Sequence, residues 1–236
     1  DDFSWTTSLN IGHNTNELVT LNGEQNEIVS GPLIHRIGEA YYSYYLYEYA
    51  GVDPQTGKEL FYKNDGTADA RQTTTNVSEA NKTIVGKHDA KVEGGLTNNL
   101  KWKWFDLGFT FTYSLGGDAF DYARWQHSDG GTYLYNGAVP AYYTLEDMWT
   151  GPGDTSAKLP AFQYGNNSQS MSSRWLMSTD YLRLKNLTFG VRMPQSWSNK
   201  IGMSNARIYF SGSNLLTWKS KGLTVDPEMP VSVVCT

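Results

Sequence analysis

The residue types that most often carry catalytic or metal chemistry are scattered in this sequence. The four histidines, His13, His35, His88 and His127, stand apart from one another and from the single cysteine, Cys235. Metal sites need several such ligands at short, fixed spacings. The pattern therefore predicts no metal site, and it indicates histidines at the surface or in turns.

Two further groups could be offered as catalytic. Glu146 and Asp147 are adjacent carboxylates, but neighbouring side chains on an extended backbone point apart, and nothing fixes the separation of about 5 to 9 Å that a glycosidase pair needs. The segment 51–58 spaces its glycines one residue too far apart for a phosphate-binding loop, and Glu59 stands where a Ser or Thr is required. No nucleophile elbow is present. We expect a protein that is not an enzyme and uses no cofactor.

Binding chemistry gathers in the segment 118–180, where Tyr and Trp stand among Asn, Gln, Ser, Asp and Gly. Flat aromatic faces beside amide and carboxylate groups suit sugar rings or peptide backbones, which offer both C–H faces and hydrogen-bonding edges. The alternative is that the rings only pack the segment onto its neighbours, because so long a loop must bury something to stay ordered. The candidate substrate-binding residues are Trp125, Tyr133, Tyr135, Tyr142, Tyr143, Trp149 and Trp175.

Four cations lie in the later strands of the chain. We expect them to face a wet lumen and to pair with carboxylates of a plug or of a barrel wall; the binding of an anionic substrate is the alternative. These residues are Arg183, Lys185, Arg192 and Arg207.

The elements that must position these side chains are strands. Apolar and polar residues alternate with a period of two, most cleanly along 105–115, where six apolar residues oppose Asp, Gly, Thr and Ser. Strands of about 9 to 11 residues suit a tilted crossing of a bilayer, whereas soluble strands usually stop at about 5 or 6. The predicted strands are 2–12, 17–22, 91–100, 105–115, 187–193 and 206–216.

Short turns and long connections alternate between these strands, as they do in bacterial outer-membrane barrels. Trp102 and Trp104 flank one short turn, as interfacial aromatic girdles do, Trp197 lies in another, and Trp218 ends the last strand at the opposite side. Six strands cannot close a barrel, since the smallest have about eight. We therefore predict an all-β fold, an antiparallel transmembrane β-barrel portion with long extracellular loops at about 23–91 and 118–180.

Composition excludes other classes. The net charge is −5 and only 18% of the residues are charged, with no Lys/Arg cluster, so no nucleic acid partner is expected, because such binding depends on neutralised phosphates. The apolar runs are too short for a transmembrane helix. The first residues lack the pattern of a signal peptide, so we expect the chain to begin as a mature protein or within something larger.

Six segments, in order along the whole chain, resemble the SusC-type (SusC/RagA-like) TonB-dependent outer-membrane transporters, which import glycans or peptides through a large plugged barrel. The segments 94–117 and 181–194 carry the clearest alternation. The six segments are 10–21, 49–62, 94–117, 148–160, 181–194 and 211–228.

The resemblance implies that residues 1–236 are a C-terminal barrel portion, integral to the bacterial outer membrane and in contact with its lipid, with the plug domain and TonB box absent. It implies a SusD-like surface lipoprotein as a lid, an oligosaccharide or peptide substrate, and the TonB-ExbB-ExbD complex acting through the absent N-terminal part. Two alternatives stay open: a secreted carbohydrate-binding β-sandwich, and an outer-membrane barrel without TonB coupling.

Overall fold

The computed structural model describes residues 2–66, 71–128, 141, 144–163, 169–223 and 225–228. They divide into two compact units. The first, which we call the strand unit, consists of the described residues of Asp1–Thr15, Asp89–Gly117 and Ser178–Val231. The second, the loop unit, holds those of Asn16–His88 and Asp118–Met177.

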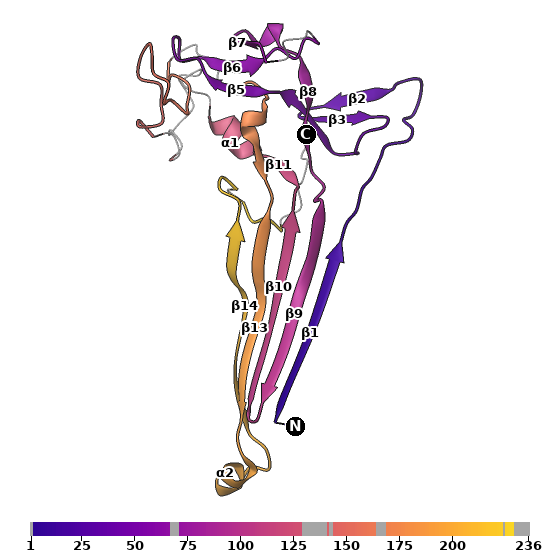
Figure 1. Cartoon of the computed structure of the whole chain (residues 1–236), viewed down its shortest axis with the longest axis vertical. Helices are drawn as coiled ribbons and strands as arrows, with labels where there is room; N and C mark the ends of the chain where they lie inside the picture. Colours follow the sequence, from indigo (N-terminus) through magenta and orange to yellow (C-terminus); the bar gives the residue numbers. More distant parts are fainter. Residues whose placement is uncertain are drawn as a thin grey trace. The chain divides into compact units, whose positions relative to one another are not determined.

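The strand unit is one sheet of five long antiparallel strands (Figure 1). The strands contain 10 to 13 residues each, which is enough for the membrane crossing of about 9 to 11 residues that the sequence predicts. Their order in the sheet is β1 (Phe3–Gly12), β9 (Val92–Trp102), β10 (Phe105–Leu115), β13 (Tyr181–Arg192) and β14 (Arg207–Lys219).

Two short connections join neighbouring strands of this sheet. The turn between β9 and β10 is the pair Lys103 and Trp104, and Lys103 adopts a positive φ of 52°, as tight hairpin turns require. The connection between β13 and β14 contains the helix α2 (Gln195–Lys200). These two connections confirm the predicted pairing of 91–100 with 105–115 and of 187–193 with 206–216.

The register gives the sheet one apolar and one polar face. Leu107 on β10 lies opposite Leu100 on β9 and Phe189 on β13. The preceding residue, Asp106, lies opposite Lys101 and Gly190. Because directly opposed residues point to the same side of a sheet, alternation along one strand becomes a continuous band across all five.

A bulge in β13 changes the faces of the residues before it. Thr110 pairs with Asn186 and Phe111 pairs with Leu184, so Lys185 is an extra residue with no partner in the β10 register. A bulge shifts the phase of the alternation by one residue. Arg183, which strict alternation would place on the apolar face, therefore shares the polar face with Thr112.

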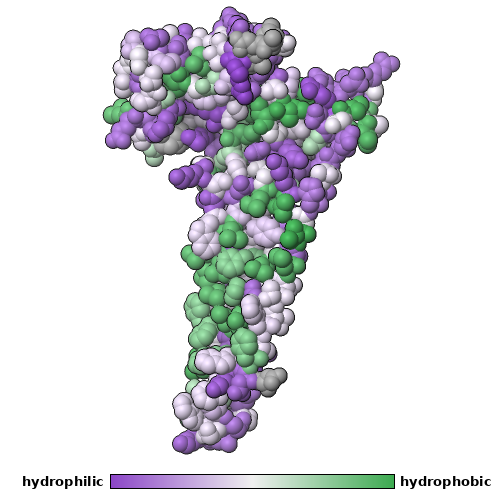
Figure 2. Space-filling view, viewed as in Figure 1, coloured by the Kyte–Doolittle hydropathy of each residue, from purple (hydrophilic) through white to green (hydrophobic). Residues whose placement is uncertain are grey.

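The apolar face is uncovered within the strand unit. On β14 the exposed fractions are 64% for Ile208, 60% for Phe210 and 53% for Trp218, and Figure 2 shows apolar side chains gathered over the long strands. So large an apolar surface marks contact with lipid or with another protein. The described residues of the strand unit contain one sheet only, so a second sheet that would make a sandwich is not found there.

The prediction of a strand at 17–22 is wrong. The backbone N–H of Leu18 donates to the carbonyl of Glu39 at 2.9 Å, and that of Gly38 donates to the carbonyl of Leu18 at 2.9 Å. These hydrogen bonds tie the segment to its own neighbourhood and leave it outside the long sheet. The sheet therefore has five described strands, and β1 leads directly into the first long connection.

The loop unit is built from short strands. One sheet has the order β2 (Glu27–Ser30), β3 (Leu33–Arg36), β4 (Ser43–Tyr47) and β8 (Lys82–Lys87). A second contains β5 (Tyr49–Val52), β6 (Glu59–Tyr62) and β7 (Thr73–Thr74). The remaining elements are β11 (Asp118–Phe120), β12 (Leu176–Ser178), the helix α1 (Tyr122–His127) and the single turns η1 (Val77–Glu79) and η2 (Ser173–Trp175).

The core of the loop unit joins both long connections. Leu33, Tyr44 and Leu46 come from the first, and Phe120 and Trp175 come from the second, and each is less than a tenth exposed. The long connections are thus folded structure with a shared core. Among the residues described, no helix combines the length and the apolar composition that a membrane crossing demands.

Candidate functional site

The polar face of the strand unit carries a charged cluster centred on Arg183, which we call the Arg183 cluster. Its guanidinium Nη2 donates to both carboxylate oxygens of Asp226, at 2.7 and 2.8 Å, and its Nη1 donates to Glu228 Oε2 at 2.7 Å. Its Nε donates to Thr217 Oγ1 at 3.0 Å. The Arg183 side chain is only 6% exposed, and each of its three guanidinium nitrogens donates at least one hydrogen bond.

Glu228 collects the remaining donors of the Arg183 cluster. It accepts from Lys185 Nζ at 2.5 Å, from Thr112 Oγ1 at 3.3 Å and from the Tyr181 hydroxyl at 3.4 Å. Lys185 reaches it from the bulge of β13. The segment after β14 therefore folds back onto the polar face and places two carboxylates among the cations of β13.

A local hydrogen bond helps to keep the Asp226 carboxylate of this cluster ionised. The backbone N–H of Glu228 donates to Asp226 Oδ1 at 2.9 Å. That hydrogen bond, followed by the one from Arg183, holds the pKa of Asp226 below its usual value. The carboxylate is thus ionised at neutral pH and complements the guanidinium. The carboxylates that pair with Arg183 and Lys185 are those of Asp226 and Glu228. The sequence alone did not identify these two residues as the partners, although both are acidic and follow the last strand.

A second cluster, which we call the Arg207 cluster, lies at the turn end of the same face. Arg207 on β14 donates to Asp106 on β10 through Nε at 3.1 Å and through Nη2 at 2.5 Å. The pair spans the intervening strand β13 at Gly190, where an added Cβ would approach Asp106 Oδ2 to 2.6 Å. Gly190 is therefore small because the ion pair passes over it.

Arg192 belongs to the same neighbourhood. It lies directly opposite Arg207 in the register, and both line a hollow of about 290 Å³ on the polar face together with Lys101 and Asp106. One carboxylate among three cations leaves this end of the face positive. The structure thus gathers the four predicted cations into two clusters, with Arg183 and Lys185 in one and Arg192 and Arg207 in the other.

Trp175 and Trp125 are structural neighbours in the loop unit. Trp175 is 2% exposed, and its indole N–H donates to the Ser170 carbonyl at 2.9 Å. Trp125 is half-buried against the same core, and its indole N–H donates to the Gln169 carbonyl at 2.8 Å. Both rings stabilise the loop unit, which fits the packing alternative, and Trp125 is the more exposed of the two.

Trp149 holds the second long connection against the first. Its indole N–H donates to the Pro54 carbonyl at 2.9 Å, and its ring lies so near Gly57 that an added Cβ there would come within 2.6 Å. Gly57 also has a positive φ of 68°. The ring is half-buried. The other predicted binding residues, Tyr133, Tyr135, Tyr142 and Tyr143, lie outside the described residues.

A buried ion pair in the loop unit was not anticipated from the sequence. Arg174 Nη1 donates to Glu59 Oε1 at 2.8 Å, and the two side chains are 9% and 2% exposed. Burial raises the pKa of Glu59, although Arg174 acts in the opposite direction. The Arg174 guanidinium also lies over the Trp175 ring, 4.4 Å from its centroid. The pair therefore links the two long connections beside the core.

The described residues offer no metal centre: no group of three or more His, Cys, Asp or Glu side chains among them could hold an ion. The polar face carries charged side chains that ion pairs hold in place. The loop unit offers aromatic rings held by indole hydrogen bonds. Such an arrangement can bind and guide polar molecules.

No protein-family model matches the sequence. TonB-dependent receptor P3 of Formosa agariphila is 32% identical over 241 residues, which cover 92% of this chain and 22% of that receptor. TonB-dependent receptor SusC of Bacteroides thetaiotaomicron is 26% identical over 249 residues, which cover 97% of this chain and 22% of that protein. The chain thus spans less than a quarter of the length of these relatives.

Solved structures show the same likeness. A chain of the RagAB peptide transporter superposes with a TM-score of 0.78 at 28% sequence identity, over 92% of this chain and 24% of that one. A chain of the RagAB peptide importer in the "open-open" state gives a TM-score of 0.76 at 26% identity, over 93% of this chain and 23% of that one.

Proposed function

The chain belongs to the SusC-type TonB-dependent receptors, and on that premise we propose that it forms part of the barrel wall and of the outer loops of an importer in the bacterial outer membrane. The whole receptor, several times longer than this chain, would take up an oligosaccharide or a peptide. Import by such a receptor requires a plug and an energy-coupling segment, which we propose lie in other parts of the protein.

The observation that carries the proposal is the two-faced sheet. Five antiparallel strands of 10 to 13 residues expose apolar side chains on one face and hold anchored charge on the other. A transmembrane barrel puts its apolar face against lipid and its polar face toward the lumen. We infer that Arg183, Lys185, Arg192 and Arg207 face the lumen.

The two charged clusters have different parts in this proposal. Arg183 and Lys185 are already occupied by Asp226 and Glu228, so their role is to fix the segment after β14 to the lumen wall. Arg192 lies in the polar hollow beside a like charge, which makes it the cation best placed for a plug carboxylate or a passing solute.

The loop unit supplies the outer binding surface. We propose that substrate contacts the open faces of Trp125 and Trp149 together with Tyr133, Tyr135, Tyr142 and Tyr143. Trp175, buried in the core against which Trp125 packs, would position that surface. A SusD-like lipoprotein would cover it as a lid, because aromatic surfaces that bind sugars or peptides bind better when water is excluded.

Uptake by living cells tests this function. A strain that lacks the full-length receptor is supplied with labelled oligosaccharides or with labelled peptides, and uptake is measured with and without the complementing gene. We expect one substrate class to enter only in complemented cells and to stop entering when the TonB-interacting segment is deleted. Uptake that survives that deletion would indicate a barrel without TonB coupling.

Partner association is tested separately. The full-length receptor, purified gently from outer membranes, is expected to bring a surface lipoprotein and the TonB-ExbB-ExbD complex or its TonB component with it. Recovery of the receptor in the secreted fraction, without membrane, would contradict the proposal.

A further inference from the structure

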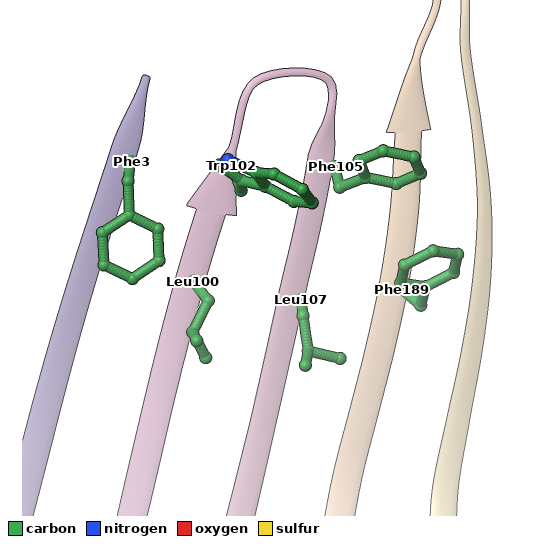
Figure 3. A pocket seen from close by; sticks show the side chains of 6 residues that line it. All are labelled: Phe3, Leu100, Trp102, Phe105, Leu107 and Phe189. Carbon is green, nitrogen blue, oxygen red and sulfur yellow. The ribbon is translucent and has the colours of Figure 1, made fainter. Parts of the chain in front are cut away.

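The apolar face of the strand unit is hollowed near its turn end. The hollow has a volume of about 630 Å³ and takes side chains from four neighbouring strands, β1, β9, β10 and β13 (Figure 3). All of its lining side chains are apolar. They are Phe3, Leu100, Trp102, Phe105, Leu107 and Phe189.

Three aromatic rings cross the hollow in a row. The centroids of Trp102 and Phe105 are 6.3 Å apart with an angle of 28° between the ring planes, and those of Phe105 and Phe189 are 6.1 Å apart with an angle of 20°. The near-parallel rings form a stacked apolar row over three strands.

Two leucines make the deeper part. Leu100 and Leu107 are opposite each other in the register, two residues from Trp102 and Phe105. Each residue of a strand advances about 3.4 Å, so the leucines lie roughly 7 Å farther from the turn. Their side chains are shorter than the rings of Trp102 and Phe105, so the hollow continues past these two rings, where Phe189, opposite Leu107, borders it. A slender apolar chain that enters at the turn end would fit it.

A cation stands at the entrance. Lys103 occupies the apex of the turn, and its Nζ lies 5.9 Å from the centroid of the Trp102 ring, which lines the hollow. The Lys103 backbone N–H donates to the Asp2 carbonyl at 2.7 Å, which ties the turn to the start of the neighbouring strand β1. This hydrogen bond fixes the backbone of the turn that carries the ammonium group, and the group itself lies over the Trp102 ring.

We infer that this hollow binds one acyl chain of a phospholipid whose anionic phosphate pairs with Lys103. The inference rests on the proposed function, because it needs this face to lie in a membrane. Trp and Lys at a barrel's turn end lie at the level of the lipid headgroups. The headgroup beside Lys103 and the chain between the rings and the leucines then match the order of groups along a phospholipid.

Apolar burial alone cannot hold such a lipid, because a chain is equally apolar in the surrounding bilayer. Selection comes from dispersion contacts with the rigid rings and from the single cation. One lysine near a membrane surface is worth about 1 kcal/mol toward anionic lipid. We therefore expect anionic phosphatidylglycerol to be preferred over zwitterionic phosphatidylethanolamine by roughly fivefold.

The experiment uses the full-length receptor, purified from outer membranes and reconstituted in vesicles that contain phosphatidylglycerol with a photoreactive acyl chain. After illumination, labelled peptides are identified by mass spectrometry. Labelling is expected on the peptides of the hollow. Leu107→Trp, which fills the hollow, should reduce it at least severalfold, while the control Leu182→Trp, on the same face but outside the hollow, should not.

A second pair of variants tests the headgroup. Lys103→Gln should abolish the preference of the hollow for phosphatidylglycerol over phosphatidylethanolamine, whereas Lys200→Gln, in the other turn, should leave it intact. The inference is overturned if labelling of the hollow is the same with and without Leu107→Trp and is the same for both headgroups. A receptor dimer that excludes lipid from the hollow also overturns it, because a second copy would then be the occupant.

Failure of the proposed function gives a different result. In that case the receptor would not be recovered from the outer membrane at all, before any lipid is added. A receptor that is in the membrane but carries no label at the hollow refutes the lipid site alone.

Discussion

The two units of this chain place their apolar side chains differently with respect to solvent. The loop unit buries its apolar side chains around Trp175 and keeps one ion pair, Glu59 with Arg174, inside. The strand unit does the reverse. It leaves Ile208 and Phe210 more than half exposed and gathers its charges on the other face.

The two units obtain their apolar environment from different sources. The loop unit supplies its own, from both long connections. The strand unit has no such core, and its apolar band needs an apolar surrounding to be stable. Stability of the loop unit should therefore depend on single buried side chains, whereas that of the strand unit should depend on which face a polar substitution enters.

The largest effect is expected in the loop unit from Trp175→Ala. The change removes a ring that is 2% exposed, and truncation of a buried Trp typically costs about 3 to 5 kcal/mol. Hydrogen exchange of the full-length receptor should show loss of protection across the loop unit. The control Leu145→Ala, at a residue 82% exposed, should leave protection unchanged; equal effects of the two variants would contradict the proposed core.

The strand unit gives the second prediction, from a pair of neighbours in β10. Phe109→Arg places a charge on the apolar face near mid-strand, where such a charge costs about 2 to 4 kcal/mol in a membrane barrel. Thr110→Arg points to the polar face and should cost about 1 kcal/mol or less, the value of one hydrogen bond. Guanidinium titration of the full-length receptor in lipid vesicles measures the free energy of unfolding of both variants. Similar losses of this free energy would mean that the two faces lie in the same environment.

How much of this contrast the sequence predicted depends on the unit. Alternation is a local property, so β9, β10, β13 and β14 were predictable, and so were the polar and apolar faces of their side chains except around the bulge of β13. The segment 17–22 was not, because its pairing with Gly38 and Glu39 depends on tertiary neighbours. The bulge at Lys185 was equally hidden, since it shows only when the registers on both sides of β13 are known.

The candidate site divides in the same way. Cations on the polar strands were visible as residue types, but their partners Asp226 and Glu228 come from a segment that folds back. Pairing over such sequence distance leaves no periodic signal. Trp175 and Trp125 illustrate a further limit, because an aromatic residue in a long loop has the same composition whether it binds a ligand or supports a core.

The third prediction concerns the Arg183 cluster. Arg183→Met should free the segment 225–228 from the polar face, at a cost of roughly 1 to 2 kcal/mol, since hydrogen bonds to charged groups contribute about 1.5 to 3 kcal/mol and solvent screens the half-exposed Asp226. Faster hydrogen exchange in 225–228 is the readout. Arg207→Met is the matched control, because it breaks only the pair with Asp106 and should leave 225–228 protected.

The smallest effect is a pH response of the loop 150–156. Hydrogen bonds from Ser156 and then Thr150 lower the pKa of Asp154 from 3.8 to about 2. Because the folded pKa lies below the unfolded one, the contribution of Asp154 to stability is complete above about pH 4 and is lost as the pH falls through 2. As the pH falls from about 4 to 2, hydrogen exchange of the Thr150 and Ser156 amides should become faster in the parent protein. It should not change in the Asp154→Asn variant. A rise in both proteins would assign the transition to another group.

The central claim, that one face of the strand unit meets lipid and the other a wet lumen, is tested most directly along β14. Single cysteines at Ile208, Tyr209, Phe210 and Ser211 of the full-length receptor in vesicles are spin-labelled, and collisions with oxygen and with a water-soluble nickel chelate are measured. A period of two is expected: oxygen access at Ile208 and Phe210, and chelate access at Tyr209 and Ser211. Chelate access at all four sites would contradict it, because both faces would then be in water.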